Sequence, residues 1–220
     1  MTKSDLIKWS LTSCFFLAAL GLSISLQSCE AKDQQKTPDT IKVELTQPHP
    51  AHFSQAEIAR IQKGKNIVGP SQKALGGQLK AALKSGGVAH ALQYCNLQAY
   101  PIMDSLSKVY KVEIRRTSLK DRNPADQPRP HEREMLETFT AKFHAGENMD
   151  PIIRNLPDGQ TGFYSAIFTQ EMCLKCHGTT ESDIAEADFA LIHELYPQDK
   201  ATGYEAGQLR GIWSLTFSPE

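Results

Sequence analysis

The segment Cys173-Leu-Lys-Cys176-His177 holds the residues with the clearest chemistry in this sequence. Two cysteines separated by two residues and followed directly by histidine are typical of covalent attachment of a c-type haem. Two thiols at this spacing reach neighbouring vinyl groups on one edge of the macrocycle, and His177 then lies beneath the iron as its proximal ligand. The motif therefore predicts one covalently bound haem c, held through Cys173, Cys176 and His177.

Three other uses of this cysteine pair are weaker alternatives. A thioredoxin-like redox pair normally lies near a βαβ pattern, and the sequence shows no such pattern. A tetrahedral zinc site needs further cysteines or histidines at motif spacing, and the chain has no second Cys-x-x-Cys. A structural disulfide between Cys173 and Cys176 is the third alternative.

The motif does not identify the second axial ligand of the iron. Histidine, methionine and cysteine can all serve, and the choice sets the reduction potential. Outside the N-terminal region the candidates are Cys95, His90, His131, His144, His193, Met103, Met135, Met149 and Met172. Each of these histidines and methionines is more often an ordinary core or surface residue.

Cys95 is more informative because the other four of the five cysteines have separate uses. Two take haem, and Cys14 and Cys29 belong to an N-terminal export segment. A free thiol in an exported domain is open to oxidation, so Cys95 is either a small buried hydrophobic side chain or a thiolate ligand of iron. His90 is five residues away, about 140° around a helix, so His90 and Cys95 would not face one ligand. From spacing alone both interpretations of Cys95 stay open.

Residues 1–28 have the pattern of a bacterial export signal. A basic start is followed by an apolar run that ends at Leu26. The sequence Leu26-Gln-Ser-Cys29 resembles a lipobox, which implies cleavage before Cys29 and lipidation of its thiol. An uncleaved membrane anchor and a soluble secreted protein are the alternatives, since the apolar run is near the length that spans a bilayer. All three export the domain, which we expect to be lipid-anchored to a bacterial membrane, facing the periplasm or the cell exterior.

The rest of the chain divides into a tether and a domain. Residues 29–52 are polar and proline-containing, which predicts a flexible tether, and residues 53–220 have the length of one domain. The formal net charge of −1 and the pI of about 6.7 argue against nucleic-acid binding, which usually shows a clear basic excess. Because no basic membrane-binding patch appears, membrane association would depend on the lipid at Cys29.

Within this domain the hydrophobic pattern predicts helices first and strands later. Helices are expected from Gln55 to near Gly64, over Gln72–Leu83, over Val88–Tyr100 with an extension past Pro101 toward Tyr110, over Glu132–His144, and over Ser182–Tyr196. Strands are expected at Val112–Arg116, Ile152–Ile153, Gly162–Phe168 and Leu209–Phe217, with a proline-rich loop over 117–130. This order indicates an α+β domain.

Five blocks of the domain carry residue patterns that occur in the same order in one known family. The blocks are Ala91-Leu-Gln-Tyr-Cys95-Asn, Ile114–Pro124, Glu132–Leu136, Cys173–Gly178 and Gly203–Gly211, and the likeness runs from about residue 55 to the end. They resemble the Tll-like haem-binding family, formerly a domain of unknown function. The resemblance implies a PAS-like fold, an antiparallel sheet flanked by helices, with haem c on one side. It also implies an unusual His/Cys pair of axial ligands, which maps onto His177 and Cys95.

The adjacent residues Arg115 and Arg116 need a separate interpretation. Neighbouring residues of a strand point to opposite faces, so one of the two could reach a haem propionate, with which a guanidinium pairs well. Arg116 is the candidate for this role. The alternative is a solvent-exposed arginine and an intramolecular salt bridge, for example to Glu132.

These observations lead to three hypotheses for function. The first is a haem c sensor of redox state or of a gas, in which reduction loosens the thiolate and opens a site for NO or CO. The second is a periplasmic electron-transfer cytochrome, whose iron stays six-coordinate in both states. The third is a small haem enzyme such as a peroxidase, which needs an open position and a distal acid–base group. A six-coordinate resting haem argues against the enzyme.

The sensor hypothesis requires a partner. The sequence shows no output domain attached to the haem-binding domain, so a signal would pass to a separate redox partner or signalling protein. A homodimer is also compatible with the sequence.

Overall fold

The computed structural model describes residues 53–219. Cys14, Cys29, the signal peptide expected at 1–28 and the tether expected at 29–52 lie outside these residues. The described elements are, in order, α1 (Gln55–Tyr110), β1 (Glu113–Thr117), the 3-10 turn η1 (Pro124–Asp126), α2 (Pro130–His144), β2 (Ile152–Asn155), the 3-10 turn η2 (Pro157–Gly159), β3 (Thr161–Phe168), α3 (Glu171–His177), α4 (Glu186–Leu195) and β4 (Leu209–Phe217). Over the described range, none of the helices has both the length and the apolar character needed to cross a bilayer.

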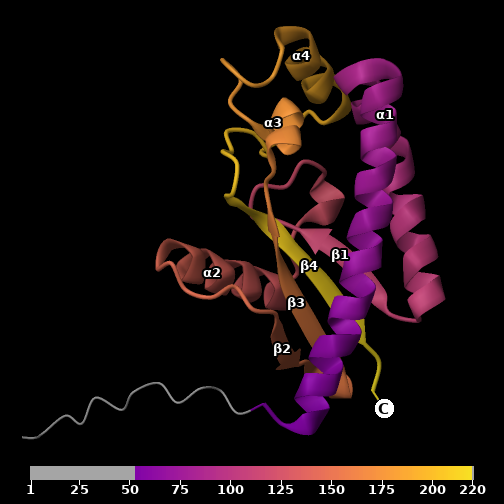
Figure 1. The fold of residues 1–220 in the computed structure, drawn as a ribbon, viewed down its shortest axis with the longest axis vertical. Helices are drawn as coiled ribbons and strands as arrows, with labels where there is room; N and C mark the ends of the chain where they lie inside the picture. Colours follow the sequence, from indigo (N-terminus) through magenta and orange to yellow (C-terminus); the bar gives the residue numbers. More distant parts are fainter. Residues whose placement is uncertain (1–52, 220) are drawn as a thin grey trace, which may run out of the picture. The chain divides into compact units, whose positions relative to one another are not determined.

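Helix α1 is a hairpin of two helical arms. The chain reverses at Gly86 and Gly87, which have non-helical backbones, and Gly87 has φ 71° and ψ −161°, a conformation that favours glycine. The second arm, residues 88–110, runs back along the first arm, residues 55–85 (Figure 1). A hydrogen bond of 3.4 Å from the Tyr94 hydroxyl to the Gln78 side chain links the arms. The predicted break between the second and third helices is therefore confirmed.

The first arm continues well beyond the end that the sequence suggested. A capping box starts it: the Glu57 amide donates to the Ser54 hydroxyl at 3.2 Å, and the Ser54 amide donates to the Glu57 carboxylate at 2.9 Å. The helix then passes through Gly64, so the predicted end near this residue is wrong. Gly64 is buried against the ring of Phe163, and a Cβ at this position would lie only 2.3 Å from that ring. Its role is close helix–sheet packing.

The four strands form one antiparallel sheet in the order β1-β4-β3-β2. Strand β4 lies at the centre, pairing with β1 through Arg116↔Trp213 and with β3 through Phe163↔Leu215. The long strand that the sequence predicted at the C-terminus is confirmed over Leu209–Phe217.

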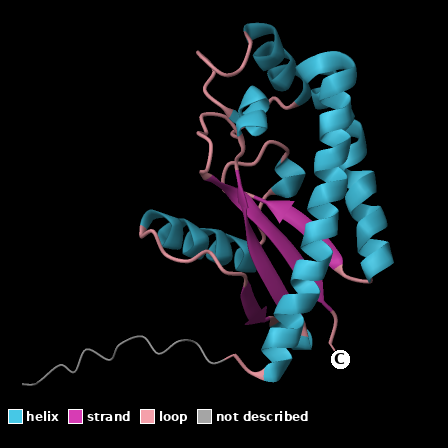
Figure 2. Ribbon diagram, in the orientation of Figure 1, coloured by secondary structure: helices cyan, strands magenta, loops and turns pink. Residues whose placement is uncertain are grey.

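Helices cover both faces of the sheet (Figures 1 and 2). On one face, Ile67 of α1 packs with Ile114, Phe163, Trp213 and Leu215. On the other face, α2 packs against the sheet. The buried residues of that second cluster are Met135, Leu136, Phe139, Tyr164 and Ile212. Neighbouring strand residues such as Phe163 and Tyr164 point to opposite faces of the sheet, so each face has its own apolar cluster. The predicted α+β architecture, an antiparallel sheet flanked by helices, is therefore confirmed.

A third apolar cluster lies beyond the end of the sheet. Leu92, from the second arm of α1, packs with Ile184 and Ile192, and Cys176 packs against these residues. Helix α4 begins at Glu186 rather than at the predicted Ser182, because residues 180–183 form a turn. The Asp183 carboxylate stabilises this turn by accepting the Thr179 amide at 2.8 Å. This cluster attaches α3 and α4 to α1.

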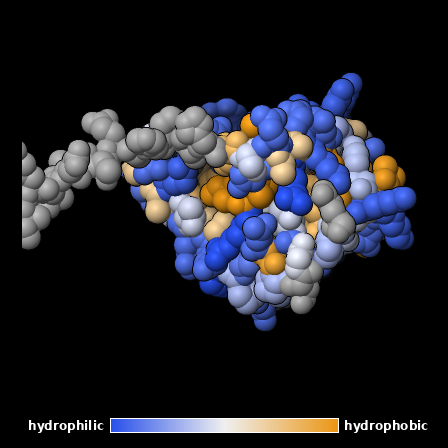
Figure 3. Space-filling model, turned by 90° about the horizontal axis from the view of Figure 1, so that it is seen from below, coloured by the Kyte–Doolittle hydropathy of each residue, from blue (hydrophilic) through white to orange (hydrophobic). Residues whose placement is uncertain are grey.

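Some apolar side chains remain at the surface where α1 begins. Phe53 and Ile58 are 46% and 47% exposed. Viewed from this end of the domain, a small hydrophobic patch is surrounded by hydrophilic residues (Figure 3). Isolated apolar side chains of this kind are ordinary on a protein surface.

The contact between Gly64 and Phe163 gives a direct test of the helix–sheet packing. We expect Gly64→Ala to lower the free energy of unfolding by about 1–3 kcal/mol, since the new methyl group forces a buried ring to move. The matched control is Gly76→Ala in the same arm, where no atom lies within 4 Å of the new Cβ. This control should raise stability by up to about 1 kcal/mol. Urea denaturation followed by circular dichroism measures both, and equal effects would contradict the packing role.

Candidate functional site

Helix α3 carries the whole Cys-x-x-Cys-His motif, a helix that the sequence analysis did not predict. At about 100° per residue, positions three and four apart share one face of a helix. Cys173, Cys176 and His177 therefore point toward the same side. All three are partly buried, and both cysteines are free thiols. The disulfide that the sequence left open for this pair is not formed.

The His177 ring is fixed by a backbone acceptor. Its Nδ1 lies 2.7 Å from the carbonyl oxygen of Ala201, so Nδ1 carries the proton and Nε2 keeps a lone pair for a metal. Tyr204 packs edge-on against the ring, with centroids 6.4 Å apart, and its amide donates to the His177 carbonyl at 2.9 Å. The loop that contains Ala201 and Tyr204 thus sets the position and the tautomer of the ring.

The electrostatic surroundings keep the His177 ring neutral. Burial lowers its pKa well below the ordinary value for histidine, and the charges of Arg210 and Arg122 lower the pKa further. A neutral imidazole is the form that binds a metal ion. The protonation state is therefore suited to ligation near neutral pH.

Cys95, from the second arm of α1, lies close to this motif. Burial raises the pKa of Cys176 to about 11, and the nearby Cys95 adds to this effect. Burial also raises the pKa of the Cys95 thiol, while the charges of Arg116 and Arg122 oppose that rise. The fold thus places Cys95 near Cys176, and the charges of Arg116 and Arg122 act on both Cys95 and His177, the ligand pair that the family resemblance implied.

The other ligand candidates have different environments. Among the histidines, His90 is exposed, and His131 Nδ1 lies 2.8 Å from the Tyr164 hydroxyl. The rings of His144 and His193 pack against Phe143 and Phe189, respectively. Among the methionines, Met103 contacts the apolar cluster on the α1 face of the sheet, and Met135 and Met149 belong to the cluster on the α2 face. Met172 is half-buried on α3. His131, Met103, Met135 and Met149 thus have packing or hydrogen-bonding roles in the sheet cores. These four residues are therefore interpreted as structural residues and not as iron ligands.

Three arginines create a strongly positive environment around His177: Arg116, Arg122 and Arg210. Arg122 forms an ion pair with Asp199. Arg116 lies over the Trp213 ring at 5.6 Å, and Arg210 donates to the Lys120 carbonyl at 3.1 Å. Among residues 53–219 neither of these two forms an ion pair at contact distance, while Asp199 raises the pKa of Arg210 and the charges of both arginines lower the pKa of Asp126.

This excess charge suits an anionic group. Burial lowers the pKa of Arg210, and the charges of Arg116 and Arg122 act in the same direction. An anion between Arg116 and Arg210 would relieve this repulsion. The sequence analysis proposed only Arg116 and missed Arg210, although Arg210 lies within the Gly203–Gly211 block.

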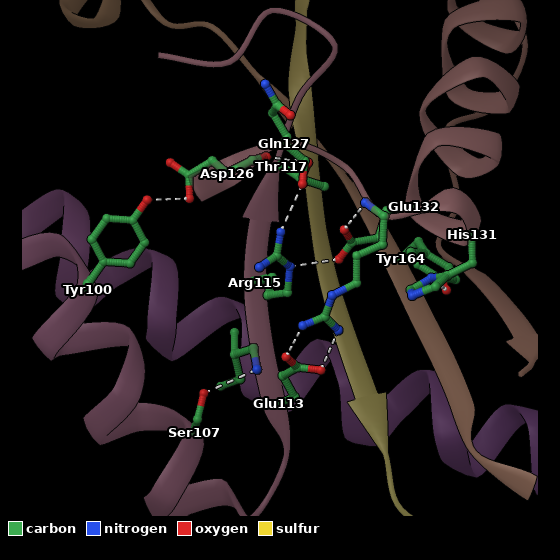
Figure 4. A network of polar contacts seen from close by, with 12 residues as sticks. Tyr100, Ser107, Glu113, Arg115, Thr117, Asp126, Gln127, His131, Glu132 and Tyr164 are labelled. Carbon is green, nitrogen blue, oxygen red and sulfur yellow. Dashed lines mark hydrogen bonds and ion pairs between the residues drawn. The ribbon is translucent and has the colours of Figure 1, made fainter. Parts of the chain in front are cut away.

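Arg115 has the role that the sequence offered as the alternative. Its Nε pairs at 3.1 Å with Glu132, whose side chain is fully buried, and Arg115 also donates to the Gln127 carbonyl at 3.1 Å (Figure 4). Arg115 therefore points to the α2 face of the sheet, and Arg116 points to the opposite face. The expectation that the two arginines separate to different faces is confirmed.

The same network holds the loop between β1 and α2. The Thr117 hydroxyl donates to the Asp126 carbonyl at 2.7 Å, and the Tyr100 hydroxyl donates to the Asp126 carboxylate at 2.9 Å (Figure 4). The Asn123 side chain accepts the Ala125 amide at 3.0 Å, which caps η1. The turn that the sequence predicted at Asn123-Pro124 is confirmed, and it fixes the segment that contains Arg122.

The residues of this site form a donor set that fits a c-type haem. Two thiols at the required spacing, a neutral imidazole and a third thiol would supply the attachment points and the ligands of the iron. Arg116 and Arg210, which form no ion pair at contact distance among residues 53–219, would supply counter-charges for the propionates. Cys95 lies near the motif, and the charge of Arg116 acts on both Cys95 and His177. The propionate role of Arg116 stays a prediction, and its exposed position over Trp213 also agrees with the alternative of a solvent-exposed arginine.

Comparisons with known proteins agree with this architecture. The sequence model of the Tll0287-like family, described as Tll0287, matches residues 27–218. A crystal structure of the cyanobacterial heme-protein Tll0287 superposes with a TM-score of 0.54 and 22% sequence identity, covering 76% of this chain and 97% of that chain. At this identity the superposition establishes a shared fold. The comparison with curated proteins finds no match.

The influence of Arg116 on Cys95 can be measured directly. Because the Arg116 charge favours the thiolate, Arg116→Gln should raise the pKa of Cys95 and slow its alkylation several-fold at fixed pH. Alkylation by iodoacetamide as a function of pH, with Cys173 and Cys176 replaced by serine, isolates this thiol. The matched control is Arg154→Gln, which removes an exposed arginine paired with Glu134. An unchanged profile in Arg116→Gln would show that this charge does not act on the thiol.

Proposed function

Because this chain belongs to the Tll0287-like family, we propose that it is a membrane-tethered haem c protein that senses redox state or a diatomic gas. The observation that carries the proposal is the approach of Cys95 to Cys176, the residue before a neutral His177 ring whose Nδ1 is 2.7 Å from the Ala201 carbonyl oxygen. A heme-protein with the same fold supports the choice of cofactor. The proposal assigns no enzymatic reaction.

Each residue of the site has a distinct role in this proposal. Cys173 and Cys176 would hold the haem covalently, and His177 would bind the iron through Nε2. Cys95 would be the second protein ligand of the iron. Arg116 and Arg210 would bind the propionates, since neither forms an ion pair at contact distance within residues 53–219. The bound group would supply one-electron redox chemistry and an iron atom able to bind NO or CO.

The sensor role depends on the protonation of Cys95. Burial raises the pKa of this thiol, so its thiolate needs nearby positive charge. Arg116 and Arg122 supply part of that charge and a ferric iron supplies the rest. With less positive charge on a bound iron, Cys95 would favour its protonated thiol over the thiolate. A protonated Cys95 would no longer hold the iron, which would leave room for a gas beside the second arm of α1.

An electron-transfer cytochrome is the second candidate function. The partial exposure of Cys173, Cys176 and His177 favours it, because a partner could approach the attachment edge closely. In this case Cys95 would stay bound to iron in both oxidation states. The two functions therefore differ in the behaviour of one side chain.

The proposed location rests on the N-terminal sequence. The basic start, the apolar run and the Leu26-Gln-Ser-Cys29 pattern support export, cleavage and lipidation of Cys29. A haem c domain is matured outside the cytoplasm, which agrees with export. We propose that the domain faces the periplasm or the cell exterior and passes its signal to a separate protein.

Substitution of Cys95 tests the proposed ligation. We expect the purified wild-type protein to show low-spin ferric haem with thiolate features, and Cys95→Ala to lose those features. The matched control is His90→Ala, on the same arm but exposed, which should leave the spectrum unchanged. An unchanged spectrum in Cys95→Ala would contradict the ligand assignment.

In the wild type, reduction followed by CO addition should change the spectrum, and failure to bind CO favours the electron carrier.

Substitution of Cys29 tests the tether. Cys29→Ser should move the protein from the membrane fraction to the soluble fraction after lysis, since lipidation requires the thiol. Cys14→Ser is the control, because this cysteine lies within the segment to be removed. Fractionation with immunoblotting measures the distribution. Continued membrane association of Cys29→Ser would indicate an uncleaved helix instead.

A further inference from the structure

The side chain of Arg122 binds two backbone carbonyls that both belong to the environment of His177. Its guanidinium donates to the carbonyl of Cys176 at 2.6 Å and to the carbonyl of Ala201 at 3.4 Å through the same nitrogen. The Cys176 carbonyl belongs to the peptide bond that leads into His177. The Ala201 carbonyl accepts the hydrogen bond from the His177 ring. One nitrogen atom of Arg122 therefore bridges the backbone of this histidine and the acceptor of its ring.

Arg122 is itself held by a buried carboxylate. It pairs with Asp199 through two contacts, from Nε at 3.1 Å and from the terminal nitrogen at 3.2 Å. The Arg122 and Asp199 side chains are only 12% and 1% exposed. Asp199 also accepts the Ala201 amide at 2.9 Å, which fixes the loop that supplies the acceptor. The arrangement is a closed cluster of Arg122, Asp199, Ala201 and His177.

A second clamp holds the same two segments together. The Lys200 amide donates to the Asp121 carbonyl at 3.0 Å, and the Lys200 ammonium pairs with the Asp121 carboxylate at 3.2 Å. Residues 121–122 are thus attached to residues 199–201 by the Asp121–Lys200 ion pair and by the contacts of Arg122 with Asp199 and Ala201. Arg122 therefore has little freedom to turn away from the Ala201 carbonyl.

We propose that the Arg122–Asp199 pair positions the His177 ring and sets the reduction potential of the iron that it binds. This inference rests on the proposed function, since it needs an iron bound to His177. Arg122 differs from Arg116 and Arg210 because a carboxylate already balances its charge. It is therefore a positioning residue and not a third propionate ligand.

The effect on potential follows from hydrogen bonding and charge. Donation from a cation to the Ala201 carbonyl leaves less electron density on that oxygen for the His177 N–H. The imidazole then has less imidazolate character and donates less strongly to iron, which favours the reduced state. The positive charge of Arg122 acts in the same direction, and Asp199 opposes it. Loss of Arg122 and loss of Asp199 should shift the potential in opposite directions.

Potentiometric titration of the full-length protein with attached haem tests this inference. Arg122→Gln should shift the midpoint potential negative, Asp199→Asn should shift it positive, and the double variant should lie between the two. Arg122→Lys keeps the charge but loses the forked donors. The potential of Arg122→Lys should therefore lie closer to the wild-type value than that of Arg122→Gln. Its ferric electron paramagnetic resonance g values, which report the ring orientation, should differ from those of the wild type. Arg154→Gln, remote from His177 in the sheet, is the control and should leave both readouts unchanged.

The outcomes separate this inference from the proposed function. Haem staining of the denatured wild-type protein is done first, and absence of covalent haem would overturn both. If haem is attached but Arg122→Gln and Asp199→Asn shift the potential in the same direction, or do not shift it, only the role of this pair is overturned. If Arg122→Gln does not accumulate, Asp199→Asn decides: a positive shift supports the inference, and no shift overturns it.

Discussion

The reversal of helix α1 at Gly86 and Gly87 is the constraint on which the site depends. Gly87 has a φ of 71°, which lets the chain turn back so that the second arm lies along the first. Leu92 on this arm packs against Ile184 and Ile192, in the cluster that also receives Cys176. Cys95 is three residues further along, on the same side of the helix as Leu92. The position of Cys95 near the motif is thus a consequence of apolar packing between α1 and α4.

The second constraint is the balance of charge around His177. Arg122 forms an ion pair with Asp199, whereas Arg116 and Arg210 form no ion pair at contact distance in the described part of the chain. Arg116 is exposed to solvent, so the cost of this excess falls on the partly buried Arg210, whose pKa is lowered by burial and by the charges of Arg116 and Arg122. An anionic cofactor would offset the cost, which is the physical basis for assigning the propionates to these arginines. The same field keeps His177 neutral and favours the Cys95 thiolate.

A separate network of hydrogen bonds and ion pairs, around β1 and the start of α2, fixes the loop that carries Arg122. The buried Glu132 pairs with Arg115 on β1 and accepts the Arg129 amide at 2.8 Å at the start of α2. The Thr117 hydroxyl, at the end of β1, closes the loop by donating to the Asp126 carbonyl. That loop contains Arg122. This network thus fixes the loop from which Arg122 reaches the carbonyls of Cys176 and Ala201.

The sequence by itself determined most of the local structure and the attachment motif. Alternating and helical periodicities located the strands and helices, because these patterns report which side chains are buried along one element. They failed at Gly64, where glycine serves helix–sheet contact instead of ending a helix, and at α3, whose seven residues are too few to show a period. The family resemblance pointed to Cys95, but only the tertiary structure decided that Arg122 and Arg210 act on His177 and that Cys95 lies beside Cys176. These residues come from segments far apart in the chain, and their approach depends on long-range packing that no local spacing encodes.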